Sequence, residues 1–329
     1  MDSNEDRLIA RYFKPIARHP GALRLNDDAA VMTPPPRHDL VVTVDAIVSG
    51  VHFFPDDPPA SIARKALRVN LSDLAAKGAK PAGFLLTLSL PKGIGDRWLK
   101  AFANGLGGDA RAYGCPLLGG DTVSTPGPVM ISVTAFGRVT PGKMVRRSSA
   151  APGDRIVVTG TIGDAALGLD ILKGGAVATA LAQDAAASRM LVSRYRVPQP
   201  RNAMAQAVRD HASAAMDVSD GLAGDLAKLC AASGVSAVID IKSEPLSAAS
   251  ATLLARGTVG IEALVSGGDD YEILCAIPEA GFAAFAQAAG LAGVAVTSIG
   301  TVIAGISAPR FLDAQGREIA LKRLSYSHF

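Results

Sequence analysis

The chain has 329 residues, of which 49% are apolar and 19% are charged, and its formal net charge at pH 7 is +3. This length predicts two domains of a globular, soluble protein, and the scattered basic residues argue against nucleic-acid binding. The three cysteines, Cys115, Cys230 and Cys275, lie far apart in apolar surroundings. They predict reduced core residues of a cytosolic protein and exclude a disulfide framework or a zinc site.

The first half of the chain alternates between helix and strand patterns. The expected elements are a helix over 5–19, a strand over 40–53, a helix over 61–78, a strand over 82–91, a helix over 96–113 and a strand over 129–139. The strand patterns are rich in β-branched and apolar residues, and Gly78 is a natural end for the second helix. Residues 141–153, with their prolines, glycines and basic residues, predict a junction between domains 1–140 and 154–329.

The second half begins with a strand over 154–160 and a helix over 163–174, and a further helix is expected at 201–211. It leads into MDVSDGLAGDL (216–226), where Ser219 or Asp220 is expected to start a helix that runs toward Ala232. Strands are expected over 235–241 and 271–277. Both halves therefore mix strands and helices, and the fold class is α+β.

Residues 280–309 carry no charge and are long enough to span a bilayer. Five glycines interrupt this stretch, so it predicts a short helix near 279–289 followed by two buried strands, and no membrane span. The polar, acidic N-terminus predicts no secretory signal, and the expected location is the cytoplasm.

Aspartates recur at the ends of apolar strands and on helix ends. They occur in NDD (26–28), TVD (43–45), NLSD (70–73), GGD (119–121), DVSD (217–220) and GGDD (267–270). Any single one is typical of a helix cap or a turn. If several converge, their repulsion reaches a few kcal/mol per pair at about 4 Å, which favours bound divalent cations. Carboxylate oxygens without Cys and with little His point to Mg²⁺, which usually serves substrate phosphates.

The usual nucleotide-binding signatures are missing. The chain has no GxxxxGK[ST] and no kinase HRD or DFG motif, and GLGGDA (105–110) lies in a helical pattern instead of following a strand. GGD at 119–121 is either a plain turn or a close backbone approach to a phosphate, with Asp121 holding a metal.

Several single residues leave two interpretations open on local grounds. Arg146 and Arg147 fit a solvated linker or a phosphate contact. His52 fits a packing residue or a ligand contact, and Tyr326 fits a tail aromatic or a ring that stacks on a substrate. Asp225 is expected to be an ordinary helix residue.

Taken together, these motifs resemble the thiamine-monophosphate kinases of the aminoimidazole ribonucleotide synthetase-like superfamily. The resemblance extends in order over essentially the whole chain, through NDDAAV, VDAIVSGVHF, KALRVNLSDLAAKGAKP, LLGGDT, RSSAAPGD, VTGTIGDAALGL, MDVSDGL, SGGDDYEIL and YSHF. It implies a two-domain PurM-like fold, with an N-terminal mixed α/β domain whose sheet pairs in a homodimer and a C-terminal α/β sandwich-like domain. It also implies ATP-dependent phosphorylation of thiamine monophosphate to thiamine diphosphate by direct γ-phosphoryl transfer.

The resemblance implies roles for individual residues, with no covalent protein nucleophile. The implied Mg²⁺ ligands are Asp28, Thr43, Asp45, Asp73, Asp121, Asp217 and Asp220. The implied ATP contacts are Gly120, Asp121, Arg147 and Ser219, and the implied contacts to the thiamine phosphate are His52, Asp269 and Tyr326. Several Mg²⁺ ions and ATP as co-substrate follow, and a monovalent cation is a further candidate.

Three positions depart from the family pattern. Leu25-Asn26 replace the glycine-containing pair before the aspartates, and Asn26 is expected to take the left-handed conformation that glycine would supply. Val44 replaces a threonine, and Asp269 is one methylene shorter than the usual glutamate. Two alternatives stay open: a synthetase of the same superfamily that acts through an acyl- or amide-phosphate intermediate, and a non-catalytic nucleotide-binding regulator.

Overall fold

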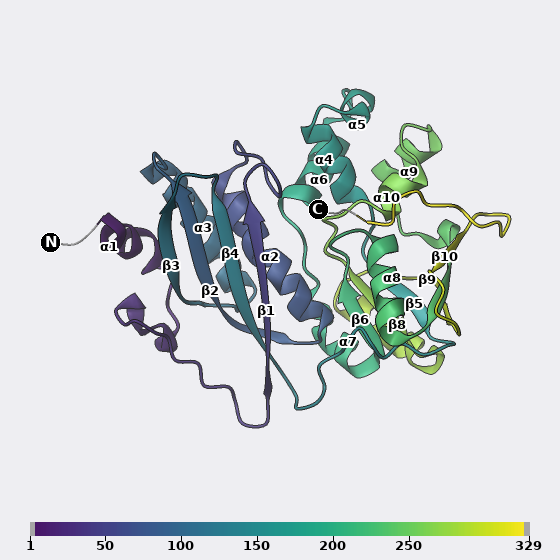
Figure 1. Ribbon diagram of the computed structural model, residues 1–329, viewed down its shortest axis with the longest axis horizontal. Helices are drawn as coiled ribbons and strands as arrows, with labels where there is room; N and C mark the ends of the chain where they lie inside the picture. The colour runs from purple at the N-terminus through teal and green to yellow at the C-terminus, as the bar shows by residue number, and fades with distance from the viewer. Residues whose placement is uncertain (1–3, 326–329) are drawn as a thin grey trace. The chain divides into compact units, whose positions relative to one another are not determined.

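The computed structural model of the chain describes residues 4–325, and the chain divides into two compact units. The first unit comprises Met1–Leu74 and Ala79–Lys143, and the second comprises Ala75–Gly78 and Met144–Phe329. Each unit is built around its own β-sheet (Figure 1).

The first unit contains a sheet of four strands in the order β1-β4-β2-β3. Their bounds are β1 Asp39–Val48, β2 Lys80–Pro91, β3 Leu117–Thr125 and β4 Met130–Val139. Strand β4 is antiparallel to both neighbours, and β3 runs parallel to β2. Side chains of β1 alternate between the two faces: Val41 is buried, whereas Val42 and Val44 are 55% and 60% exposed. One face of this sheet is therefore covered, and we call the opposite one the outer face.

Helices α2 (Pro59–Ala76) and α3 (Asp96–Ala112) cover the first face, behind the sheet in Figure 1. GLGGDA lies inside α3, and its glycines allow close packing. A Cβ at Gly105 would lie 2.5 Å from the Ala60 carbonyl oxygen, and one at Gly107 would lie 2.6 Å from Cγ2 of Ile16. These glycines therefore serve helix packing, and they do not form a dinucleotide-binding turn.

The N-terminal segment differs from the single helix expected over 5–19. Helix α1 (Asn4–Leu8) passes into the π-helical turn η1 (Ile9–Phe13), and a 3-10 segment η2 (Pro20–Leu25) follows. Pro15 has no N–H to continue the helical hydrogen bonds, which explains the early end.

The second unit contains a sheet of six strands in the order β10-β7-β9-β5-β8-β6. Their bounds are β5 Arg155–Thr159, β6 Ala214–Asp217, β7 Ser236–Asp240, β8 Ile273–Ile277, β9 Val296–Ile303 and β10 Arg310–Leu312. Among the described pairings of this second sheet, only β10 with β7 is parallel.

Helices cover both faces of the second sheet. The helices are α4 Asp164–Leu172, α5 Ala176–Ala180, α6 Ala185–Arg196, α7 Ala205–His211, α8 Leu222–Ser233, α9 Ala248–Ala255, α10 Ile261–Val265 and α11 Phe282–Leu291, with 3-10 turns η3 Asn202–Met204, η4 Ile241–Ser243 and η5 Glu279–Gly281. Successive residues of β8 belong to different cores: Leu274 packs in the cluster that contains α8 residues, and Cys275 packs in the one that contains α7 and α11 residues. This arrangement forms the sandwich-like layer structure.

The strand and helix predictions are confirmed for most of the other segments, with two further corrections. Residues 119–121, for which a plain turn is one of two interpretations, lie in the edge strand β3. Within 280–309, helix α11 is followed by one strand, β9, and β10 begins only at Arg310. None of the helices in the described residues is long and apolar enough to cross a membrane. The three cysteines are free and buried.

Candidate active site

The DVSD motif forms the turn between β6 and α8. Strand β6 ends at Asp217, which is buried, while Ser219 and Asp220 are half-buried. Helix α8 starts at Leu222 with Gly221 as its N-cap, so the expected start at Ser219 or Asp220 is wrong. Gly221 has φ of 115°, and a Cβ there would lie 2.7 Å from the Ser266 carbonyl carbon. Only glycine fits this turn.

Asp225 fixes the same turn from inside α8. Its Oδ2 accepts hydrogen bonds of 3.0 Å from the backbone amides of Ser219 and Asp220, and its Oδ1 accepts one of 2.8 Å from Nζ of Lys228. The side chain is fully buried, and burial raises the pKa of the Asp225 carboxyl. Asp225 is therefore not an ordinary helix residue. A carboxylate in the first turn of a helix is the sequence signal that points to such a contact.

Lys228 also pairs with Asp220. Its Nζ lies 2.5 Å from Oδ2 of Asp220, and the two side chains are 41% and 36% exposed. The charge of Asp220, which precedes α8, is thus balanced by Lys228 in the second turn of that helix.

The GGDD loop, residues 267–270, lies directly beside the DVSD turn. The amide of Asp269 donates a hydrogen bond of 2.8 Å to the Ser219 carbonyl oxygen, and the amide of Tyr271 donates one of 2.8 Å to that of Val218. A Cβ at Gly268 would lie 2.6 Å from the Ser219 oxygen. The structure therefore brings together Ser219, Asp220 and Asp269, although the two motifs are about fifty residues apart in the sequence.

The loop has a strained backbone. Asp269 and Tyr271 have φ values of 72° and 52°, in the left-handed region. This region costs a residue with a Cβ about 1–2 kcal/mol. Such strain persists only where neighbouring contacts hold it, and it recurs at ligand-binding sites.

In the first unit, three predicted metal ligands lie on the helix-covered face. Thr43 Oγ1 donates a 2.5 Å hydrogen bond to Oδ2 of Asp73, so β1 and α2 hold these two side chains together. Asp45 lies two residues after Thr43 in β1 and therefore on the same face of the sheet. Its amide donates a hydrogen bond of 3.0 Å to Oδ1 of Asn70. Asn70 and Asp73 lie three residues apart and share one side of α2.

Asp28 and Asp121 lie elsewhere, in a cavity of about 690 Å³ at the outer face. Asp121 pairs in register with Thr87 of β2, which also lines the cavity. Most of the remaining lining is apolar, and none of the described lining residues is lysine, arginine or histidine. Gly120 is needed for strand pairing, because a Cβ there would overlap the Leu86 carbonyl oxygen.

The five predicted ligands of the first unit thus form two groups on opposite faces of the sheet. Strands β1 and β3 are also at opposite edges, three strand spacings or about 14 Å apart. In the part of the chain that the structure describes, no three His, Cys, Asp or Glu side chains gather closely enough to hold a metal ion. The donor set nevertheless fits Mg²⁺ chemically, because all its members offer oxygen and the cavity carboxylates have no cationic neighbour among the lining residues.

His52 is held at the end of β1. Its Nδ1 accepts a 3.0 Å hydrogen bond from the Val48 amide, and its carbonyl oxygen accepts one of 2.8 Å from the buried Lys65 Nζ. A neutral His52 ring therefore carries its proton on Nε2.

The other residues singled out from the sequence lie in different places. Arg147 is exposed, and its carbonyl oxygen accepts from Ser233 Oγ at the C-terminal end of α8, whereas Ser219 precedes the N-terminal end. Tyr326 lies outside the described residues. The expectation for Asn26 is wrong: its φ is −110°, and Leu23, Arg24 and Leu25 take the left-handed conformation instead. Val44 points to the outer face, away from Asp73.

Comparison with known proteins assigns the class and then the family. Residues 26–139 match the family model "AIR synthase related protein, N-terminal domain", and residues 151–308 match its C-terminal counterpart. The two sheets and these matches define a two-domain protein of the AIR synthase related class.

Relatives that match almost the whole chain identify the family within this class. The thiamine-monophosphate kinase of Caulobacter vibrioides is 43% identical over 324 residues, covering 97% of this chain and 89% of the relative. The crystal structure of the thiamine-monophosphate kinase from Stenotrophomonas maltophilia K279a has a TM-score of 0.83 and 38% identity, covering 95% and 96% of the two chains. The chain belongs to the thiamine-monophosphate kinase family. A structure described as AaThiL complexed with AMPPCP and TMP has a TM-score of 0.77 and 29% identity, covering 92% and 91%.

Proposed function

We propose that this chain transfers the γ-phosphoryl group of ATP to thiamine monophosphate, giving thiamine diphosphate and ADP. Family membership supports the reaction. The observation that carries it within the chain is the hydrogen bond from Asp269 to Ser219, because it joins the proposed acceptor loop to the proposed nucleotide turn. The bond fixes the distance between these two backbone segments, and positioning of the substrates is a large part of the catalysis of phosphoryl transfer.

In this proposal the protein supplies positioning, and it forms no covalent intermediate. Ser219, Gly120, Asp121 and Arg147 contact ATP, while His52, Asp269 and Tyr326 contact thiamine monophosphate. Because Nδ1 of His52 accepts from the Val48 amide, Nε2 is the ring nitrogen proposed to donate to a phosphate oxygen. The strained loop and the buried Asp225 hold Asp269 and Ser219 in place before substrate arrives.

Mg²⁺, when bound, would neutralise phosphate charge as donor and acceptor approach each other. The residues proposed to hold it are Asp28, Thr43, Asp45, Asp73, Asp121, Asp217 and Asp220. The carboxylate cavity and the Thr43–Asp73 pair supply the oxygen ligands that Mg²⁺ prefers. A monovalent cation stays a candidate without an assigned site, and the cytoplasm stays the proposed location.

The active form is proposed to be a homodimer that pairs the outer faces of two first-unit sheets. Val42, Val44 and Val123 expose 55%, 60% and 42% of their surface on this unit, an apolar area suited to a partner. A two-fold axis parallel to the strands would place β1 of one copy over β3 of the other. Such pairing would place the outer-face Asp121 of one copy over strand β1 of the partner, the edge strand that carries Asp45.

The test is a coupled assay with ATP, Mg²⁺ and thiamine monophosphate, with both products separated by chromatography. The proposal expects thiamine diphosphate and ADP in equal amounts. ADP and inorganic phosphate without thiamine diphosphate would favour the synthetase alternative. ATP binding with no turnover under any of these conditions would favour a non-catalytic regulator.

A further inference from the structure

The loop that carries Asp269 alternates between anchored and less buried residues. Asp270 and Glu272 are 1% and 0% exposed, whereas Asp269 and Tyr271, the two left-handed residues, are half-buried. The anchored residues therefore hold a backbone that the other two would not adopt unaided.

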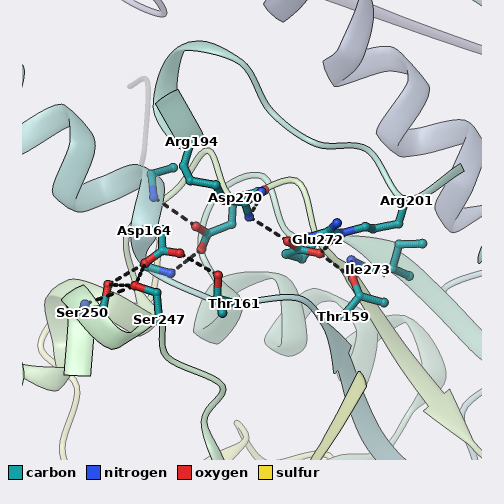
Figure 2. A network of polar contacts seen from close by, with 12 residues as sticks. Thr159, Thr161, Asp164, Arg194, Arg201, Ser247, Ser250, Asp270, Glu272 and Ile273 are labelled. Carbon is teal, nitrogen blue, oxygen red and sulfur yellow. Dashed lines mark hydrogen bonds and ion pairs between the residues drawn. The ribbon is translucent and has the colours of Figure 1, made fainter. Parts of the chain in front are cut away.

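Glu272 is the centre of a buried ionic cluster (Figure 2). Its Oε1 accepts from Nη2 of Arg194 at 2.7 Å and from Nη2 of Arg201 at 2.5 Å. Its Oε2 accepts from Nε of Arg201 at 2.6 Å and from Oγ1 of Thr159 at 2.7 Å. One carboxylate thus joins the end of β5, helix α6 and the segment before α7 to the start of β8.

The surrounding chain is shaped for this cluster. Gly160 has φ of 59°, and a Cβ there would overlap the Glu272 carboxylate. The hydroxyl of Thr159 also accepts a hydrogen bond of 2.8 Å from the Ile273 amide. This one hydroxyl is therefore bonded to the Glu272 side chain and to the backbone of the next residue. Arg194 adds a long hydrogen bond of 3.5 Å to the Asp270 carbonyl oxygen.

Asp270 anchors the loop on a separate element. Its Oδ2 accepts a hydrogen bond of 2.8 Å from the Gly163 amide, and its Oδ1 accepts one of 3.4 Å from the Ala165 amide, at the start of α4. Asp164 in turn accepts from Ser247 and Ser250 (Figure 2). Asp270 thus fixes one side of the loop, and Glu272 fixes the other side, directly after Tyr271.

We propose that Glu272 is a positioning residue for the phosphoryl acceptor. By holding Arg194, Arg201 and Thr159, it keeps Asp269 and Tyr271 in the left-handed conformation that presents Asp269 beside Ser219. Buried ionic groups are costly, and their best-supported use is to select one conformation over others. This inference rests on the proposed function, in which Asp269 contacts thiamine monophosphate.

The effect should fall on the acceptor more than on the nucleotide. Without the cluster, the amide bonds to Ser219 and Val218 remain, but the Glu272 anchor no longer opposes the strain of Asp269 and Tyr271. These residues are then expected to relax toward ordinary backbone angles, which moves the Asp269 carboxylate. The Ser219 turn keeps its own anchor, because Asp225 holds its amides independently of Glu272.

The test compares Glu272→Gln with Glu279→Gln as the matched control. Glu279 makes the same two-bonded contact to an arginine, Arg155, but its side chain is 67% exposed and lies outside the loop. For Glu272→Gln we expect KM for thiamine monophosphate to rise about tenfold and KM for ATP to change less than about twofold. The control is expected to keep both constants.

Arg201→Lys is the milder variant, in case Glu272→Gln folds poorly. It keeps the positive charge but loses the paired geometry, so it is expected to raise the acceptor KM by about threefold. All assays run at least 15 °C below each melting temperature, a margin of roughly two typical single-substitution shifts. Equal effects on both KM values, or a lower melting temperature with unchanged kinetics, would overturn the positioning role. If the wild type forms no thiamine diphosphate, the proposed function fails instead, which is a separate result.

Discussion

The backbone amide of Asp269 donates a hydrogen bond of 2.8 Å to the carbonyl oxygen of Ser219. This contact joins a strained loop before β8 to the turn before α8, and each partner has its own buried carboxylate anchor. Asp225 accepts from the Ser219 amide, and Glu272 holds the far end of the Asp269 loop. The second unit therefore presents both motifs on a preorganised backbone, a property that favours catalysis by positioning.

Lys228 should weaken cation binding at Asp220, because its ammonium group occupies one carboxylate oxygen. Replacing it by methionine is expected to lower the Mn²⁺ concentration at the midpoint of a thermal-shift titration by about two- to fivefold, as expected for an exposed pair. The titration is done without nucleotide, and Lys242→Met serves as the control. Equal midpoints for Lys228→Met and wild type would show that Asp220 does not bind the cation.

Glu244 should make stability depend on pH. It is 7% exposed, neither carboxylate oxygen accepts a hydrogen bond from the described residues, and burial raises the pKa of its carboxyl from 4.5 to about 8. Between these values the folded protein keeps a proton that the unfolded chain has lost. The free energy of unfolding should therefore fall as pH rises through this window, by about 1 kcal/mol per pH unit.

The corresponding experiment is urea unfolding from pH 5 to pH 9. Glu244→Gln keeps the shape without the ionisation, so its free energy of unfolding should decline less and exceed that of the wild type at pH 8. Glu318→Gln, at an exposed position, is the control. A parallel pH profile for wild type and Glu244→Gln would contradict the assignment.

Arg24 should be a site where glycine stabilises the fold. Its φ is 58°, between two leucines that are also left-handed. Arg24→Gly is expected to raise the free energy of unfolding by roughly 0.5–1 kcal/mol, because glycine tolerates this backbone. Arg111→Gly in the last turn of α3 should lower it by a similar amount. Urea unfolding measures both, and a loss of stability in both variants would refute the strain argument.

Mixed dimers should reveal whether two copies build one site. If Asp45 and Asp121 act together only across the dimer, Asp45→Asn and Asp121→Asn should each be nearly inactive. Refolding them together in equal amounts should restore about a quarter of wild-type activity, because half of the dimers then carry one intact site of two. Failure to recover activity, with dimers confirmed by light scattering, would place both residues in the site of one chain.

Local sequence patterns predict the helices and strands of this chain more accurately than they predict which residues contact each other. The 61–78 and 82–91 predictions hold because the local apolar pattern, with Gly78 and Pro91 as end signals, is enough to indicate α2 and β2. The strand β3 is not predicted, because Gly119 and Gly120 have low strand propensity and pairing with β2 decides their conformation.

The site is predicted only in part for a similar reason. Residue type and spacing single out the aspartates, but sheet register decides that Asp121 and Asp45 lie on opposite faces. Glu272 has no local signal, since its arginine partners are over seventy residues away. Asp225 does carry a signal, its place in the first turn of α8, although only the structure shows which amides it accepts.

In the proposed reaction, a phosphoryl group passes directly from ATP to thiamine monophosphate. The most direct measurement uses ATP labelled with ¹⁸O in its γ-phosphoryl group, together with Mg²⁺ and thiamine monophosphate, and follows the label by mass spectrometry. Direct transfer predicts that the labelled group appears as the terminal phosphoryl of thiamine diphosphate, with one ADP formed for each thiamine diphosphate. Label recovered only as inorganic phosphate, with thiamine monophosphate unchanged, would contradict it.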